Sequence, residues 1–218
     1  MWDWNYAFEV LPEILAALKI TVTVTFVSFA LALAGGLVLA LLRRSKSKWL
    51  SWPAAAVIEF IRSTPILVQA IILFFVLPLY GITFSAFTAG VIALGLHYST
   101  YLSEVYRSGI DAVQKGQWEA AQALNFSKSQ TWIRIILPQA IPPIIPVLGN
   151  YLITMFKETP ILAAITLMEI LATAEEIGSE SWRYLEPITI VGILFLLLSY
   201  PSSLLVSYLE KRLNRGQT

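Results

Sequence analysis

The sequence contains no cysteine, a single histidine and few charged residues, which make up 13% of its 218 residues. The absence of cysteine excludes disulfides, a thiol nucleophile and cysteine-ligated metal sites. The histidine, His97, has no cluster of metal ligands around it in the sequence, so we expect neither a metal site nor a catalytic constellation. The sequence also lacks the G-x-x-x-x-G-K-S/T loop that cradles nucleotide phosphates. Chemistry on ATP is therefore not expected of this chain.

Apolar residues, by contrast, are abundant, because 57% of the chain is hydrophobic and its mean hydropathy is +0.70. Soluble domains average about 45–50% apolar and about 25% charged residues. A membrane-spanning helix needs about 20 mostly apolar residues, and the sequence offers such stretches at about 14–42, 54–80, 84–108, 141–172 and 187–209. The sequence predicts an all-α, polytopic membrane bundle of about five transmembrane helices in a single domain, 1–218.

Two prolines interrupt these stretches. Pro160 breaks the fourth one, which is therefore either a single kinked helix or a span followed by a re-entrant piece. Pro65 removes a backbone donor from the second one. We expect the carbonyls that both prolines free to meet protein or a water-filled cavity, as in the discontinuous helices that line substrate sites of transporters.

Basic residues are unevenly distributed along the chain. With the N-terminus outside, the cytoplasmic segments receive 11 of the 15 basic residues, namely Arg43, Arg44, Lys46, Lys48, Arg107, Lys115, Lys128, Arg134, Lys211, Arg212 and Arg215. The outer side receives the acidic segment 169–186, in which Arg183 is the single basic residue. The positive-inside rule therefore predicts an outer N-terminus and a cytoplasmic C-terminus. The acidic N-terminal segment is unlike a cleavable signal, so we expect it to be retained.

The interval 111–139 is polar and has the signals of two short helices. The first is expected at about Gln117 to Leu124, with Trp118, Ala121 and Leu124 at a spacing of three on one face. Asn125 is a plausible left-handed stop, because asparagine tolerates that conformation. On the predicted topology this interval faces the cytosol.

The second short helix is expected to begin with a capping box formed by Ser127 and Gln130 and to end at Pro138. Two interpretations of the pair are open. It is either a compact knob that docks into a soluble partner or an amphipathic connector that lies on the headgroups, with Trp118 and Trp132 in the boundary.

This interval resembles the EAA loop of ATP-binding-cassette importer permeases. The family pattern is EAA, three residues, glycine, nine residues, isoleucine, one residue and Leu-Pro. The sequence matches it at these spacings, except that asparagine replaces the glycine, with Glu119, Ala120, Ala121, Asn125, Ile135, Leu137 and Pro138. Other segments, EFIRSTPILVQ, YLSEVYRSGIDAV with KGQWEAA, and KETPILAAITLMEI, resemble the polar amino-acid branch of these permeases.

The resemblance implies a set of partners. They are a dimer of a cytoplasmic ATPase, a second permease subunit that is a copy or a paralogue, an extracytoplasmic solute-binding protein and the lipid of the inner, or cytoplasmic, membrane. The chain is then a transport subunit and not an enzyme, it needs no cofactor of its own because ATP is bound by the partner, and nucleic acid is not expected. The residues implied in coupling to the ATPase are Gln117, Trp118, Glu119, Ala120, Ala121, Leu124 and Asn125.

Charged residues at membrane depth usually face protein or water, which makes the second and fourth stretches the predicted walls of the solute pathway. The candidate pathway residues are Arg62, Thr64, His97, Thr100, Lys157, Glu158 and Glu169. Each has a plainer alternative. Arg62 is three residues from Glu59 and can form a local ion pair with it, and His97 can be a hydrogen-bonded packing residue.

Glu169 is the candidate for contact with solute, since it could receive an ammonium or guanidinium group. Its plainer alternative is a carboxylate at the outer interface. Lys157 and Glu158 can likewise pair with each other across neighbouring helices. Gly35, Gly36, Gly90 and Gly95 are expected to allow close approach of helices.

Together these features favour a permease subunit of a binding-protein-dependent, ATP-driven importer. It would move polar amino acids or a related zwitterionic compatible solute, such as ectoine, into the cytoplasm by alternating access. A first alternative is an ion-coupled secondary carrier with Glu169 and His97 as coupling groups, although the inverted repeats typical of such carriers are not detected. A second is a non-transporting scaffold whose cytoplasmic helix recruits a protein.

Overall fold

The computed structural model describes residues 2–214, which form helices joined by turns and bends, with no strand in that range. Helix α1 spans Trp4–Arg43 and α2 spans Lys48–Arg62. Helix α3, Ile66–Ile71, continues as a π-helical segment, Ile72–Val76, and a 3-10 turn, Leu77–Tyr80. The remaining helices are α4 (Ala86–Asp111), α5 (Lys115–Ala123), α6 (Lys128–Gln130), α7 (Leu137–Glu158), α8 (Ile170–Ser181) and α9 (Leu185–Asn214).

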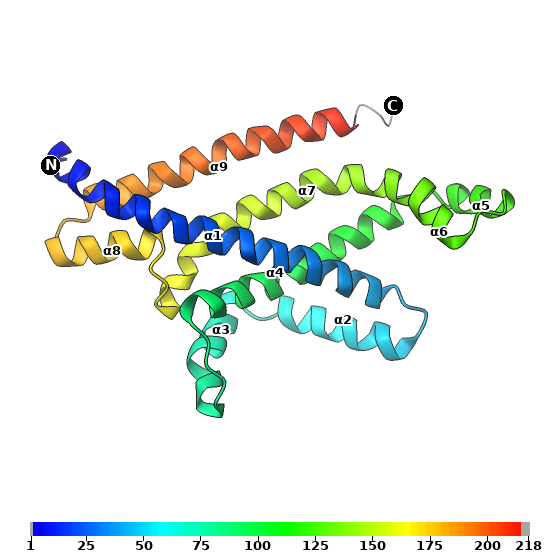
Figure 1. Cartoon of the computed structure of the whole chain (residues 1–218), viewed down its shortest axis with the longest axis horizontal. Coiled ribbons are helices and arrows are strands. Elements are labelled where there is room, and N and C mark those ends of the chain that lie inside the picture. The colour runs from blue at the N-terminus through cyan, green and yellow to red at the C-terminus, as the bar shows by residue number, and fades with distance from the viewer. Residues whose placement is uncertain (1, 215–218) are drawn as a thin grey trace.

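Long helices α1, α4, α7 and α9 run along the longest axis of the molecule (Figure 1). Three helical segments have the length and hydropathy to cross a membrane, namely Trp4–Arg43, Lys128–Ile165 and Leu185–Leu213. A fourth does so if α2 and the segment Ile66–Tyr80, which are bent by 100° at the break between them, count as one span. Helix α4 is a further long helix, and it packs between α1 and α7. This arrangement agrees with the prediction of about five membrane helices.

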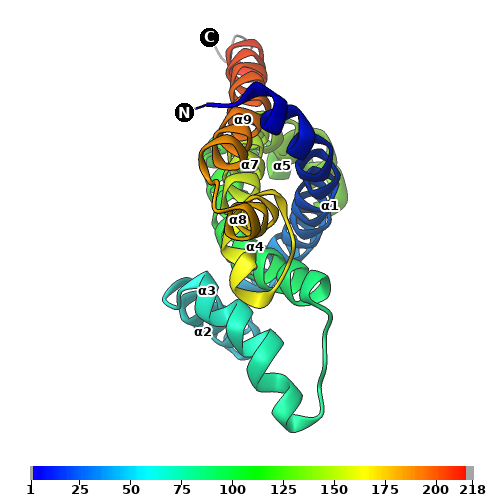
Figure 2. The same ribbon diagram turned by 90° about the vertical axis from the view of Figure 1, so that its left-hand side faces the viewer.

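The second apolar stretch is therefore not one straight helix. Helix α2 ends at Arg62, and α3 starts directly after Pro65. Viewed along the molecule, the segment that starts with α3 projects away from the bundle of α1, α4, α7, α8 and α9 (Figure 2). The fourth stretch also divides, because α7 ends at Glu158 and passes through a 3-10 segment, Thr159–Ile165, into the separate helix α8.

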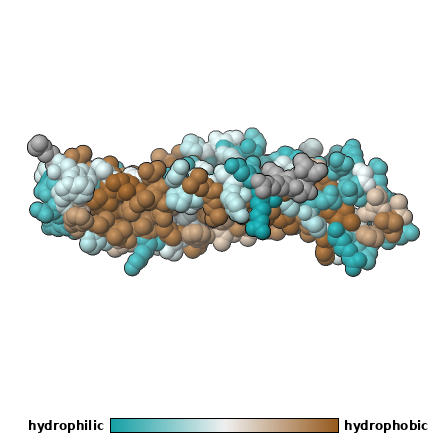
Figure 3. All heavy atoms as spheres, turned by 90° about the horizontal axis from the view of Figure 1, so that it is seen from above, coloured by the Kyte–Doolittle hydropathy of each residue, from teal (hydrophilic) through white to brown (hydrophobic). Residues whose placement is uncertain are grey.

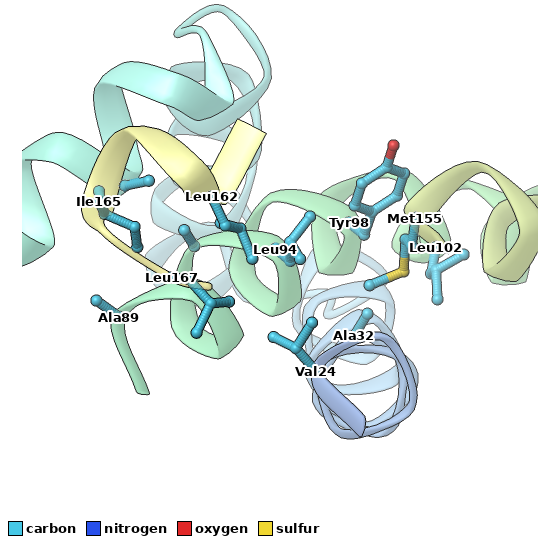
Figure 4. Packing of buried hydrophobic residues seen from close by; sticks show 12 residues of the cluster. Val24, Ala32, Ala89, Leu94, Tyr98, Leu102, Met155, Leu162, Ile165 and Leu167 are labelled. Atoms are coloured by element: carbon cyan, nitrogen blue, oxygen red, sulfur yellow. The ribbon is translucent and has the colours of Figure 1, made fainter. Parts of the chain in front are cut away.

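The main core lies between α1, α4, α7 and the 3-10 segment that follows α7. Val24 of α1, Leu94 of α4 and Leu162 of the 3-10 segment are fully buried there (Figure 4). Glycines let α1 and α4 approach closely. A Cβ atom on Gly36 would lie 2.9 Å from the Cβ atom of Leu102, so the expectation of close helix approach at this glycine is confirmed.

An ion network joins the ends of α1 and α4. Arg43 contacts Glu104 at 2.9 Å, and Arg107 contacts Glu104 at 2.6 Å and Asp111 at 3.2 Å. Arg44 pairs with the same aspartate. This end of the molecule also carries α5, α6 and the end of α9 (Figure 1), and so it collects the basic segments that the positive-inside rule assigns to the cytoplasm.

The opposite end holds the start of α1 and the corner between α8 and α9. The carboxylate of Glu186 accepts hydrogen bonds from the Asp3 amide at 2.9 Å and from Arg183 at 2.8 Å. The guanidinium of Arg183 also lies 4.1 Å from the ring centroid of Tyr6, whose hydroxyl donates to Ser181 at 2.6 Å. These contacts attach the first turn of the chain to the α8–α9 corner.

Candidate coupling element and solute pathway

Helix α5 forms a knob that packs against the junction of α4 and α7. The rings of Trp118 and Trp132 meet edge to face, with centroids 5.3 Å apart. They cover a small core made by Ile110, Ile136 and Ala140. The knob is therefore a packed continuation of the bundle at the ends of α4 and α7.

The turn after α5 has the predicted local geometry. Asn125 has φ 55°, in the left-handed region, and the following amide, that of Phe126, donates to Ala121 O at 3.0 Å. The capping box is also present. The Ser127 Oγ accepts from the Gln130 amide at 3.3 Å, and the Gln130 Oε1 accepts from the Ser127 amide at 2.9 Å.

The candidate coupling residues divide between two faces of α5. Ala121 is buried and Trp118 half-buried, so these two form the face that holds the knob in place. The exposed residues are Gln117, Glu119, Ala120, Leu124 and Asn125. Leu124 was expected on the face of Trp118 and Ala121, but it is 69% exposed. It follows the last residue of α5, where the helical spacing no longer holds.

The second short helix does not end at Pro138 as predicted. A π-helical segment, Thr131–Ile136, follows α6 and leads without a break into α7, which begins at Leu137. Pro138 therefore lies inside a continuous helical segment, at the point where the π-helical hydrogen-bond pattern returns to the α-helical one.

The side-chain amide of Gln69, a residue that the sequence analysis did not identify, donates hydrogen bonds across the break before α3. The Gln69 Nε2 lies 2.8 Å from Ile61 O and 3.1 Å from Thr64 O, and it also lies 2.8 Å from the hydroxyl of Thr64. The carbonyls freed by Pro65 thus meet protein, as expected of a break at membrane depth. Gln69 is four residues after Pro65, and this spacing is the signal that could have identified it.

The side chain of Arg62 points to aromatic rings. Its guanidinium carbon lies 5.0 Å from the ring centroid of Tyr101. Glu59 and Arg62 form no ion pair among the described residues, so the local pairing considered from the sequence is wrong. A guanidinium over an aromatic face is a favourable contact, and it connects the end of α2 to the middle of α4.

Tyr101 belongs to a cluster of rings from α4 and α7. His97 lies 5.7 Å from Tyr98 and 5.3 Å from Tyr101, measured between ring centroids. Tyr151 of α7 lies 6.0 Å from Tyr98 and 6.1 Å from Tyr101. Glu158, at the end of α7, lies about two helical turns after Tyr151 and therefore on the same face of that helix. The structure thus brings Arg62 and His97, two of the candidate pathway residues, to one ring cluster and places Glu158 on the face of α7 that carries Tyr151.

The other candidates lie elsewhere. Thr100 is fully buried, and its hydroxyl donates to His97 O at 2.6 Å, whereas Lys157 is exposed. Thr64 is part of the break before α3. Lys157 and Glu158 are consecutive residues of α7 and form no ion pair with each other among the described residues.

Glu169 is fully buried and caps α8. Its Oε1 accepts from the Ala172 amide at 2.7 Å, while Oε2 has no partner among the described residues. The amide after it, that of Ile170, donates to the hydroxyl of Thr21 at 3.2 Å. The structure does not join Glu169 to the ring cluster, and in this conformation its carboxylate is closed off from solvent.

Comparison with known proteins agrees with this architecture. A probable amino-acid ABC transporter permease of Sinorhizobium fredii is 45% identical over 97% of this chain and 94% of its own. An arginine transport system permease of Bacillus subtilis is 35% identical over 98% and 96%. The crystal structure of an amino acid ABC transporter with histidines superposes with a TM-score of 0.91, at 35% identity, covering 97% of this chain and 99% of that one.

The chain belongs to the family of binding-protein-dependent transport system inner membrane components, whose family pattern matches residues 32–215. It is the permease subunit of an ABC importer, a multi-pass inner-membrane protein and not an enzyme. Membership of this family implies a separate ATPase and a second permease as partners. The ion-coupled carrier and the scaffold are therefore not supported.

Proposed function

We propose that this permease imports polar amino acids or a related zwitterionic solute, and that the ring cluster of α4 and α7 is part of its pathway. The observation that carries the proposal is a pair of opposite charges beside the tyrosines, since Arg62 contacts the ring of Tyr101 and Glu158 lies about two helical turns after Tyr151 on the same face of α7. Arg62 suits the carboxylate of a zwitterion and Glu158 its ammonium group. The tyrosine faces add a site for the cation. The amino-acid permeases among its relatives support this substrate class.

The coupling role is proposed for the exposed face of α5. Glu119 and Leu124 are available to a cytoplasmic partner, while Trp118 and Ala121 fix α5 to the bundle. ATP, bound by that partner, would close the ATPase dimer and draw two such knobs together, and an external solute-binding protein would deliver the solute. The second permease is a copy of this chain or a paralogue. Coupling then requires that the ATPase interact differently with the two states of the permease.

The test is uptake of radiolabelled amino acids into proteoliposomes that contain the permease, its ATPase and the binding protein. We expect Glu158→Gln to lower uptake at least ten-fold while basal ATP hydrolysis is retained, because recognition is lost and coupling is not. The matched control is Glu176→Gln, which alters an exposed carboxylate on α8. Equal uptake by Glu158→Gln and the control would contradict the proposed pathway.

A further inference from the structure

An apolar cavity of about 460 Å³ lies between α1, α7 and α9. Phe26, Leu152 and Val206 are among its lining residues. Among the described residues that line it there is no charged side chain, and its polar groups are the hydroxyls of Thr25, Ser199 and Ser202. Two of these hydroxyls are already used within their helices. Thr25 donates to Thr21 O at 2.8 Å, and Ser202 donates to Leu198 O at 2.7 Å. The cavity therefore offers its occupant an almost wholly apolar surface.

A second cleft, of about 700 Å³, lies nearer the end that carries α5, and its lining residues come from the start of α7, the end of α9 and the segment 109–117. On α7 the lining passes from Gly149 and Ile145 in the first cavity to Pro142 in the second, and on α9 it passes from Leu209 to Arg212. The second cleft is more polar, because Arg212 and the side-chain amides of Gln114, Gln117 and Gln139 line it. The two hollows have no lining residue in common, but they follow one another along α7 and α9 and define a groove that is apolar in its first part and basic in its second.

Position in the membrane restricts what can fill this groove. Helices α1, α7 and α9 belong to the three segments of the described residues that are long and apolar enough to span a membrane. The face that carries α9 is hydrophobic over much of its middle and hydrophilic at both ends (Figure 3). On the predicted orientation, Arg212 lies at the cytoplasmic headgroup level, where anionic lipids gather and attract basic residues. A molecule with an apolar chain and one anionic group at its end matches the groove, because its chain fits the apolar part and its anionic group then lies beside Arg212.

We propose that an anionic phospholipid occupies the groove between α7 and α9. One acyl chain lies in the apolar part, against α1, and the phosphate is held beside Arg212. A bound lipid of this kind fills a hollow that the chain's own side chains leave open beside the knob that α5 forms. It gives the permease a preference for membranes with anionic lipids.

The experiment measures lipid retained by the permease and its ATPase after equilibration with vesicles of equal parts phosphatidylglycerol and phosphatidylcholine that carry the same acyl chains. Native mass spectrometry counts the lipids that remain on the washed complex. We expect phosphatidylglycerol to be retained over phosphatidylcholine by about five-fold, the preference that one arginine near the surface supplies. Excess inorganic phosphate should leave the lipid in place, and its displacement by phosphate would contradict a lipid ligand.

Variants on α9 separate the two parts of the groove. Arg212→Gln should keep the retained lipid but abolish the preference for phosphatidylglycerol, whereas the control Lys211→Gln, outside the groove, should keep that preference. Ser202→Trp should fill the apolar part and lose lipid of both kinds. The control Leu204→Trp, on a side chain that is 54% exposed and does not line the cavity, should retain it.

A second variant that fills the apolar part of the groove keeps the test valid if Ser202→Trp does not fold. Leu205→Trp alters a lining side chain that is 60% exposed, so it disturbs little packing. Full lipid retention by both blocking variants would overturn the proposal, as would an unchanged preference in Arg212→Gln.

The alternative occupant of the groove is a second copy of this chain. Because the sequence has no cysteine, a disulfide between two copies of Ser202→Cys would show this and would also overturn the proposal.

Discussion

At the scale of single residues, Asn125 decides the geometry of the coupling element. Its φ of 55° turns the chain between α5 and α6. A left-handed conformation costs about 1–2 kcal/mol for most residues with a Cβ atom, while asparagine and glycine adopt it readily. The element's shape therefore depends on one tolerant residue at this position.

Substitutions of Asn125 test this dependence. Asn125→Gly should keep the thermal stability of the permease and its association with the ATPase. Asn125→Val, which resists a positive φ, should cost about 1–2 kcal/mol of stability and weaken that association. Thermal unfolding and copurification measure the two effects, and equal behaviour of the valine and glycine variants would show that the turn does not matter.

A second residue-scale prediction concerns pH at the end of the molecule that carries the start of α1. The backbone N–H groups of Tyr6 and Asn5, and to a smaller extent Arg183, hold the pKa of Asp3 below its ordinary value. A lowered pKa in the folded state means that the carboxylate stabilises the fold above its ordinary pKa of about 3.9, and that this stabilisation is lost as pH falls through the lowered pKa. Asp3→Asn, which keeps a capping side chain, should thus lower the unfolding temperature at pH 7, and the difference should shrink below pH 4.

The matched control for this measurement is Glu9→Gln, an exposed carboxylate on the same helix. It should leave the unfolding temperature close to that of the unaltered protein at both pH values. A difference between Asp3→Asn and the unaltered protein that grows in acid would contradict the assignment.

At the scale of helices, α1 and α4 form a closely packed pair. A Cβ atom on Gly36 would also lie 3.0 Å from Ser99 O, a backbone atom that cannot swing aside. The ion network of Arg43, Glu104 and Arg107 joins the same two helices at their ends. The pair should therefore move as one unit when α5 is displaced.

Gly36→Ala should separate the two helices and destabilise the protein by roughly 1–3 kcal/mol, the usual cost of overpacking. Gly192→Ala is the control, since nothing lies within 4 Å of its added Cβ atom. In α9 that substitution should be neutral or stabilise by up to about 1 kcal/mol, because alanine favours helix more than glycine does. Thermal unfolding measures the stability of the two variants, and equal stabilities would contradict the close contact of α1 and α4 at Gly36.

Features set by neighbouring residues were predictable from the sequence. The capping box at Ser127 and the left-handed Asn125 depend on a few adjacent residues, and both are present. The prediction that a helix ends at Pro138 was wrong, because the π-helical segment before this proline continues into α7. The contact of Arg62 with Tyr101 and the burial of Glu169 join different helices. Such tertiary contacts cannot be read from spacing in one segment.

At the scale of the whole molecule, the two ends carry different chemistry. One end has the basic segments and the exposed face of α5, and the other has the start of α1 and the α8–α9 corner. The ring cluster of α4 and α7 lies on helices that connect to the α5 knob. The molecule thus provides a mechanical connection between the proposed site of coupling and the proposed solute pathway.

We propose that the ATPase acts on the permease through the exposed face of α5. The most direct measurement is copurification of the ATPase with the permease variant Glu119→Lys, beside Glu210→Lys, which makes the same charge change at an exposed position near the end of α9. We predict that both variants insert into the membrane, that Glu119→Lys loses the ATPase, and that Glu210→Lys retains it. Retention of the ATPase and normal transport by Glu119→Lys would contradict the account.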